Sequence, residues 1–373
     1  MPGLTVAPTP FPKDLPTHPL MVIDFALIQA GDIHEQNRLW EAATSLGFWY
    51  LKHHTAIDEV NDMFDMGAET LALPLSEKMK FEQGDEGDSF GYKAKGKVAT
   101  DKFGTLDTVE FFNVAQDDAL AWPRAVHRTY PSTANARMED TIIPFTRKSM
   151  NVNDTLLAIF ERRLGLPEGT FAELHLTSVP SGSEARCIKT PPNQDKAGIG
   201  AHTDFGTLSI VHNRLGGLQV LPPGTETWLY IKPLPGHAIC NVGDTLAIFS
   251  GGILRSNVHR VMPPPGEQSR FERYSIAFFT RPNNDVVLRA LSEKSQMIAD
   301  AVARAPEGQF ETNSTAGEWV QRRIRNLRLK SRAGWLASLG TEHGGVGTPS
   351  PPTSSPIIPS GELAPHSPVE ASA

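Results

Sequence analysis

The feature that most constrains the fold is the stretch of residues 185–282, in which short β-rich segments alternate with turn residues. Val, Ile and aromatic residues recur in short runs, and Gly, Pro and Asn separate these runs. Closely spaced short strands with such punctuation are typical of an antiparallel sandwich or barrel. The stretch therefore predicts a β core, and we look for the chemistry of the chain there first.

The flanking segments carry helical signals instead. Asp32 and Glu35 have capping-box spacing at the start of a predicted helix, and Gly47 supplies its stop. Helices in some regions and strands in others indicate an α+β fold. The remaining local predictions are strands at 20–23 and 48–51, helical residues from 57 to 81 with a break at 73–75 and a new N-cap at Ser76, a glycine-rich loop at 84–104, a helix over about 153–164 and helical residues over about 292–329.

Bulk composition narrows the function only slightly. The 373 residues are 39% hydrophobic, which is ample for a core, and a formal net charge of -7 gives no general attraction to nucleic acid or an anionic membrane. Cys187 and Cys240 are the only cysteines, which fits free thiols in a reducing compartment. No apolar run reaches membrane-spanning length. We expect a cytoplasmic protein with a small-molecule substrate, and the oligomeric state stays open.

A candidate metal site lies inside the β-rich stretch. His202 and Asp204 are two residues apart, and on a strand such positions point to the same face. His259 lies in a second extended apolar run. Two imidazoles and one carboxylate are the facial ligand set of non-haem Fe(II) oxygenases, which leaves positions open for a cosubstrate and O₂. The alternative is structural, with Asp204 capping a turn and His259 hydrogen-bonded in the core.

Arg273 and Ser275 form a second pair two residues apart, followed by an apolar run. A guanidinium inside a β core is costly unless an anion meets it, and its forked donors suit a carboxylate. A buried Arg273 therefore favours a dicarboxylate ligand. The alternative places Arg273 on the solvent face, paired with Glu272 or Glu267. The occurrence of all these residue types in one β-rich stretch favours the site.

Several motifs carry a family resemblance. The chain resembles the isopenicillin N synthase-like branch of the 2-oxoglutarate- and Fe(II)-dependent dioxygenases from about residue 19 to about residue 330. The supporting motifs are HTDFGTLS at 202–209, GGLQV at 216–220, NVGD at 241–244, SNVHRV at 256–261 and RYS at 273–275, with VIDF at 22–25, LGFW at 46–49 and LPLSEK at 73–78 in the leading half.

The resemblance implies roles for the candidate site residues. His202, Asp204 and His259 would bind Fe(II). Arg273 and Ser275 would bind the distal carboxylate of 2-oxoglutarate. The cofactors implied are Fe(II), 2-oxoglutarate as cosubstrate, O₂, and ascorbate as an activator. No residue is assigned as a general acid or base.

One position departs from the family pattern. Members often place a tyrosine that binds the cosubstrate in the strand before the His-x-Asp motif, where Thr190 stands here. The hydroxyl of Thr190 is closer to the backbone, which weakens the expectation of that contact. Asn241 and Gly243 are interpreted as turn residues that orient the strand leading to His259.

The fold implied by the resemblance is a double-stranded β-helix, or jelly roll, with flanking helices and a leading α/β region. The reaction would convert 2-oxoglutarate to succinate and CO₂ while a small metabolite, in secondary metabolism, undergoes hydroxylation, desaturation or ring closure. The expected organisation is a flexible lead at 1–18, an N-terminal dioxygenase domain at 19–130, a helical connection at 131–184, the Fe(II)/2-oxoglutarate jelly-roll domain at 185–283, C-terminal helices at 284–335 and a disordered tail at 340–373.

Substrate contacts are predicted less directly. By the same likeness, residues 90–92, 110–112 and 278–279 could line the pocket, although aromatic residues in β-rich proteins are usually core. The basic run 322–328 has apolar residues at helical spacing, so we interpret it as an exposed helix face rather than a nucleic-acid patch. Two other functions stay open: an Fe(II) oxidase of this fold that does not use 2-oxoglutarate, and a metal-containing binder without catalysis.

Overall fold

The structure, a computed structural model, describes residues 9–328 and Gly340, and it has the mixed helix and sheet content of the predicted α+β class. The helices are α1 (Phe25–Gln29), α2 (Ile33–Ser45), α3 (Ile57–Leu71), α4 (Leu75–Met79), α5 (Gln116–Ala121), α6 (Ser132–Asn135), the π-helical turn η1 (Met138–Ile142), α7 (Ile143–Arg163), α8 (Thr170–Glu173), α9 (Asp244–Phe249), the 3₁₀ turn η2 (Gly266–Arg270), α10 (Gln296–Ala303) and α11 (Ala316–Leu327).

The strands form one large and two small sheets. The strands are β1 (Val22–Asp24), β2 (Phe48–Lys52), β3 (Gly91–Lys93), β4 (Glu110–Ala115), β5 (Glu184–Thr190), β6 (Ile199–His202), β7 (Leu208–Asn213), β8 (Leu218–Val220), β9 (Leu229–Tyr230), β10 (His237–Val242), β11 (His259–Val261), β12 (Arg273–Thr280), β13 (Val287–Arg289) and β14 (Glu311–Thr315).

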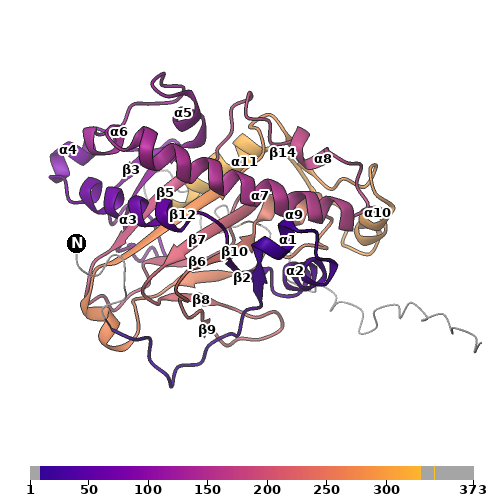
Figure 1. The fold of residues 1–373 in the computed structure, drawn as a ribbon, viewed down its shortest axis with the longest axis horizontal. Helices are drawn as coiled ribbons and strands as arrows, with labels where there is room; N and C mark the ends of the chain where they lie inside the picture. The colour runs from indigo at the N-terminus through magenta and orange to yellow at the C-terminus, as the bar shows by residue number, and fades with distance from the viewer. Residues whose placement is uncertain (1–8, 329–339, 341–373) are drawn as a thin grey trace, which may run out of the picture.

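The large sheet has eight strands in the order β1-β2-β10-β7-β12-β5-β4-β3, and a four-stranded sheet has the order β6-β11-β8-β9. Among the pairs of strands in these two sheets only β1 and β2 are parallel. In Figure 1 the long helix α7 lies across the strands of the large sheet, with α3 beside it, and β8 and β9 lie on the other side. The large sheet is thus covered by helices on one face and by the small sheet on the other.

Side-chain alternation in the central strands separates a core face from a cavity face. In β12, Ile276 and Phe278 belong to a buried apolar cluster with residues of α3, η1 and α7, whereas Ser275 and Ala277 line a cavity between the two sheets. The period of two along a strand explains this division. The residues of β12 that reach the cavity are therefore mainly the odd-numbered ones from Arg273 to Phe279.

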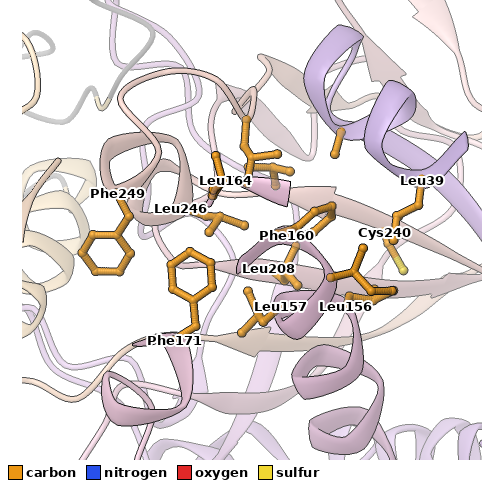
Figure 2. Packing of buried hydrophobic residues seen from close by; sticks show 14 of the residues in the cluster. Leu39, Leu156, Leu157, Phe160, Leu164, Phe171, Leu208, Cys240, Leu246 and Phe249 are labelled. Carbon is orange, nitrogen blue, oxygen red and sulfur yellow. The ribbon is translucent and has the colours of Figure 1, made fainter. Parts of the chain in front are cut away.

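The largest apolar cluster lies between α7, α2 and the large sheet. Leu156 and Phe160, four residues apart on α7, pack with Leu39 of α2 and with Leu208 and Cys240 of the sheet (Figure 2). All five side chains are almost fully buried. A fully buried Leu or Phe side chain contributes about 1.5–3 kcal/mol, so this cluster holds the sheet against its helices.

Several local predictions are confirmed. Asp32 caps α2 by accepting a hydrogen bond from the Glu35 backbone N–H. The Glu35 side chain does not complete a capping box, because it accepts from the Asp24 backbone N–H instead. Gly47 follows α2 with a φ of 77°, and a β-carbon there would meet the Arg255 carbonyl oxygen, so only glycine fits.

Other local predictions are wrong. Helix α7 begins at Ile143, not near residue 153, since Pro144 is compatible with the first turn of a helix. The N-cap of α4 is Pro74 rather than Ser76, and the loop at 84–104 contains β3. The helical stretch predicted at 292–329 is interrupted by β14. Of the predicted tail at 340–373 only Gly340 lies within the described residues, as do residues 9–18 of the lead.

Candidate Fe(II) and 2-oxoglutarate site

Three predicted metal ligands converge at one end of the small sheet. His202 is the last residue of β6, His259 is the first residue of β11, and the two are cross-strand partners. Asp204 lies beyond the end of β6, so a turn rather than strand alternation brings it to the histidines. Its Oδ1 atom is 3.7 Å from the Nε2 atom of each imidazole. Ligands bound to one divalent ion at about 2.1 Å lie at most about 4.2 Å apart, so Oδ1 of Asp204 is close enough to share an ion with either imidazole.

Backbone hydrogen bonds fix both imidazole rings. Nδ1 of His202 lies 2.8 Å from the Gly200 carbonyl oxygen, and Nδ1 of His259 lies 3.2 Å from the Asn257 carbonyl oxygen. A carbonyl oxygen only accepts, so each Nδ1 carries the proton and each Nε2 presents a lone pair toward Asp204. A hydrogen bond made by the ring nitrogen that does not bind the metal orients a metal-binding imidazole. Burial, and then the charge of His259, lowers the pKa of His202 to about 4, which keeps it neutral at pH 7.

The carboxylate of Asp204 is divided between two tasks. Its Oδ2 atom accepts hydrogen bonds from Ser209 Oγ at 2.6 Å and from Asn241 Nδ2 at 2.7 Å, which leaves Oδ1 to face the imidazoles. Burial alone would raise the pKa of Asp204, but the two histidines and these hydrogen bonds together lower it to about 2. From the sequence alone, Asn241 is interpreted only as a turn residue. In the structure it also orients a candidate metal ligand, the carboxylate of Asp204.

The donor set fits a ferrous ion. Within the described residues, His202, Asp204 and His259 form a group of potential ligands whose atoms all lie within 4.8 Å of one another. Two imidazoles and one carboxylate, with the remaining directions open to a cavity, are the donors of a 2-His-1-carboxylate Fe(II) centre. No thiolate is available, because Cys187 and Cys240 are buried elsewhere in the core.

Arg273 reaches the same cavity from the large sheet. It is 2% exposed, and its nitrogen atoms donate to the Gly216 carbonyl oxygen, Ser275 Oγ and Asn213 Oδ1. All three partners are neutral, and burial lowers the pKa of Arg273 to about 10. A guanidinium has five N–H donors, so two remain for a ligand. Ser275 in turn donates to Asn213 at 2.5 Å, which holds the pair in place.

The alternative solvent-facing arrangement of Arg273 is wrong. Glu272 pairs with Lys189 at 2.7 Å, and Glu267 pairs with Arg270 at 2.9 Å. Thr190 lies directly across the β5–β12 pair from Arg273. Its hydroxyl is buried without a hydrogen-bond partner in the described part of the chain, and the residue is not among those that line the cavity.

The cavity that joins these groups has a volume of about 170 Å³. Of the aromatic residues proposed as pocket lining, Phe111 and Phe279 line it. Tyr92, Phe112 and Phe278 belong to the apolar core instead. Phe90, Gly91 and Glu110 do not line the cavity either: Phe90 contacts the His127 ring, and Glu110 accepts hydrogen bonds from Lys78 and Tyr92.

The basic run at 322–328 is not an exposed helix face as a whole, so that interpretation is wrong. Arg323 is 1% exposed and pairs with the buried Asp244, and it also donates to the Thr203 carbonyl oxygen at 3.2 Å. Ile324, Leu327 and Arg328 line the cavity. Helical spacing located the helix correctly, but the side that faces the protein also carries arginines. No helix of the described residues is long and apolar enough to cross a membrane.

Two sequence models of protein families match the chain. The one described as the 2OG-Fe(II) oxygenase superfamily matches residues 183–282. The one described as the N-terminal region of non-haem dioxygenases in morphine synthesis matches residues 20–133. The two matches together span more than half of the chain and flank the connection that contains α7.

Related proteins and solved structures agree with the two family matches. The oxidoreductase vrtI of Penicillium aethiopicum is 30% identical over 73% of this chain and 66% of its own length. The 2-oxoglutarate-dependent dioxygenase gloE of Glarea lozoyensis is 29% identical over 73% of this chain and 82% of its own. A putative 2OG-Fe(II) oxygenase of Caulobacter crescentus has a TM-score of 0.62 at 28% identity, covering 84% of this chain and all of that one.

A full-length protein of Neurospora crassa, solved in complex with alpha-KG, shares the fold, with a TM-score of 0.65 at 21% identity over 84% of this chain and 97% of that one. These likenesses confirm the jelly-roll fold and are consistent with the isopenicillin N synthase-like branch. With a ligand set that fits ferrous iron and a matching family core around it, the chain belongs to the 2OG-Fe(II) oxygenase superfamily, as an oxidoreductase that uses Fe(II) and 2-oxoglutarate.

Proposed function

We propose that His202, Asp204 and His259 bind Fe(II), that Arg273 and Ser275 bind the distal carboxylate of 2-oxoglutarate, and that the cavity holds a small organic metabolite whose C–H bond is oxidised. The observation that carries this proposal is the opening of both groups into one cavity, the ligands from the small sheet and the guanidinium from the large one. A bidentate Arg–carboxylate contact provides both energy and orientation.

The protein's own residues bind and orient the metal and the cosubstrate and exclude water from them. When bound, Fe(II) with 2-oxoglutarate and O₂ supplies the oxidising chemistry, which belongs to the cofactor. Gly200 and Asn257 keep the imidazoles in the ligating tautomer, and Asn241 and Ser209 turn Oδ1 of Asp204 toward them. No side chain is assigned as a general acid or base.

The substrate class follows from the cavity and from relatives. A volume of about 170 Å³ favours a small molecule. The matching N-terminal model is described by morphine synthesis, and the related plant enzyme of Oryza sativa is named a homoarginine-6-hydroxylase. We therefore propose a metabolite substrate, in secondary metabolism, with no nucleic-acid partner. The two free, buried cysteines support placement in a reducing compartment such as the cytosol.

The test is stoichiometric. Purified protein with Fe(II), ascorbate and 2-oxoglutarate is expected to form succinate, and a panel of extracts or candidate metabolites is expected to raise its rate. His202→Ala and Asp204→Ala should abolish succinate formation while far-UV circular dichroism stays that of the wild type. Anaerobic addition of 2-oxoglutarate should produce an absorption band in the visible region with the wild type only.

Each rival function has its own result. Product formed without 2-oxoglutarate would favour an Fe(II) oxidase that does not use the cosubstrate. Bound metal with neither succinate nor an absorption band would favour a binder without catalysis. Normal succinate formation by His202→Ala would remove the proposed ligand assignment altogether.

A further inference from the structure

A cluster of cations lines the cavity in addition to the arginine assigned to 2-oxoglutarate. Lys93, Arg186, Arg281 and Arg328 all line it and come from β3, β5, the end of β12 and the end of α11. Their charges act on one another through space. Burial lowers the pKa of Lys93 well below its ordinary value, and the positive charges of Arg328 and then Arg186 lower it further. The cations therefore crowd one region of the cavity wall.

Ion pairs among the described residues involve only some of these basic side chains. Lys93 pairs with the buried Asp107. Arg186 and Arg281 share a single carboxylate, Glu184, at 2.6 and 3.0 Å. Within the described residues, these three basic side chains thus form ion pairs with only two carboxylates.

Arg328 has no ion pair with any described residue. It is 1% exposed, and among the residues that the structure describes its side chain makes one hydrogen bond, from Nη2 to Gln83 Oε1, while Nε and Nη1 have no partner there. Burial lowers the pKa of Arg328. The negative charges of Glu82 and Asp85, which lie beyond ion-pair distance, raise the pKa of Arg328, and the positive charge of Arg186 lowers it further. A buried guanidinium with free donors is a costly arrangement unless a ligand completes it.

Arg328 and the metal ligands belong to one continuous site. Arg186 interacts through space both with Arg328 and with Asp204. Its guanidinium lies over the Phe111 ring at 4.3 Å and over the Phe279 ring at 4.8 Å, and these contacts favour its observed position. Phe111 and Phe279 line the same cavity as Arg328 and the metal ligands, and aromatic walls suit the apolar body of a ligand.

We propose that Arg328, supported by Arg186, binds a carboxylate of the substrate, so that the substrate class is a small organic acid with an apolar body. This inference rests on the proposed function, because it places the acid beside 2-oxoglutarate in the same cavity. The partnerless Nη1 of Arg328 supplies donors for this carboxylate, and a charge-assisted hydrogen bond to an anion is stronger than one to a neutral amide.

The test uses the full chain loaded with Mn(II) and 2-oxoglutarate, which removes turnover from the readout. The probes are phenylacetate, 3-phenylpropionate and 4-phenylbutyrate, each paired with its neutral amide. Because Mn(II) relaxes protons close to it, the NMR relaxation of the probe's ring protons reports binding next to the metal. We expect at least one acid to bind at least about tenfold more tightly than its amide, the effect of a charge-assisted hydrogen bond.

Variants at Arg328 assign that preference. Arg328→Gln should abolish the acid preference and leave the 2-oxoglutarate affinity unchanged, whereas Arg328→Lys should retain part of the preference. Arg325→Gln is the matched control, because it removes the same charge from the same helix at a residue that contacts the Glu86 carbonyl oxygen and does not line the cavity. It should keep the full preference.

Thermal unfolding provides a second, independent readout. Since the charge of Arg328 is buried and unpaired, the metal-free Arg328→Gln protein should melt no lower than the wild type. A preference that is missing in all three pairs, or one that persists in Arg328→Gln, overturns the inference, as does a large loss of thermal stability in that variant. If Mn(II) and 2-oxoglutarate do not bind the wild type at all, the proposed function fails instead.

Discussion

Asn241→Ala tests whether a residue outside the ligand set controls the metal. Asn241 donates one of two hydrogen bonds to Asp204 Oδ2, at 2.7 Å, and Ser209 donates the other. A hydrogen bond to a charged group contributes about 1.5–3 kcal/mol, and loss of such a second contact lowers metal affinity about 10- to 100-fold. The two ranges agree, since tenfold corresponds to about 1.4 kcal/mol. We therefore expect Mn(II) to bind Asn241→Ala on the order of tenfold more weakly or worse.

The assay is a titration of the protein with Mn(II), monitored by calorimetry. 2-Oxoglutarate is absent, so that only the protein ligands contribute to metal binding. Asn135→Ala is the control, because Asn135 donates to the Tyr130 carbonyl oxygen and does not line the cavity. It should cost some stability and no metal affinity. If folded Asn241→Ala binds Mn(II) within about twofold of the wild type, well below the loss expected for a missing second contact, the reasoning about Asp204 is refuted.

Three further predictions address the cosubstrate, acid stability and the core. Arg273→Ala should raise the KM for 2-oxoglutarate roughly 30-fold or more, which corresponds to a loss of about 2 kcal/mol or more of binding free energy. Arg270→Ala, at a 69% exposed side chain, should leave this KM unchanged. Equal kinetics of the two variants would contradict the assignment of Arg273. Burial lowers the pKa of His175 to about 4, so the unfolded chain binds a proton that the folded chain refuses as the pH falls from about 6.5. The metal-free protein should therefore lose about 1–2 kcal/mol by about pH 5 from this residue, and urea unfolding of His175→Gln should show a shallower loss. Leu156→Ala, at a fully buried position, should lower the free energy of unfolding by about 2–5 kcal/mol in the same assay, and a change below about 1 kcal/mol would count against the packing in Figure 2.

The candidate ligands could be predicted from the sequence because their chemistry and spacing are local. His202 and Asp204 are close along the chain, and His259 lies in a later strand of the same motif-rich stretch. The way in which the ligands converge differs in part from the prediction. The strand ends at His202, and a turn rather than strand alternation brings Asp204 to the histidines. The alternation of β12 was sufficient to place Arg273 and Ser275 on one face, but not to say which face was buried.

The contacts that support the site could not be predicted, because they join residues far apart in sequence. Asn213 reaches Arg273 and Ser275 from the neighbouring strand, and Asn241 reaches Asp204 across 37 positions. The arginines of α11 were misread for a related reason. Helical periodicity separates apolar from polar positions, yet it cannot distinguish a charge in solvent from one that meets a buried partner.

The buried contact between Arg323 and Asp244 has a consequence for engineering. Arg323 also donates to the carbonyl oxygen of Thr203, the residue between two metal ligands, and stacks on Phe205 at 4.4 Å. A chimaera that imports a foreign C-terminal helix to change selectivity would thus also alter the turn on which iron affinity depends. Grafts that transfer Arg323 and Asp244 as a matched couple should tolerate such exchanges, and those that split the couple should not.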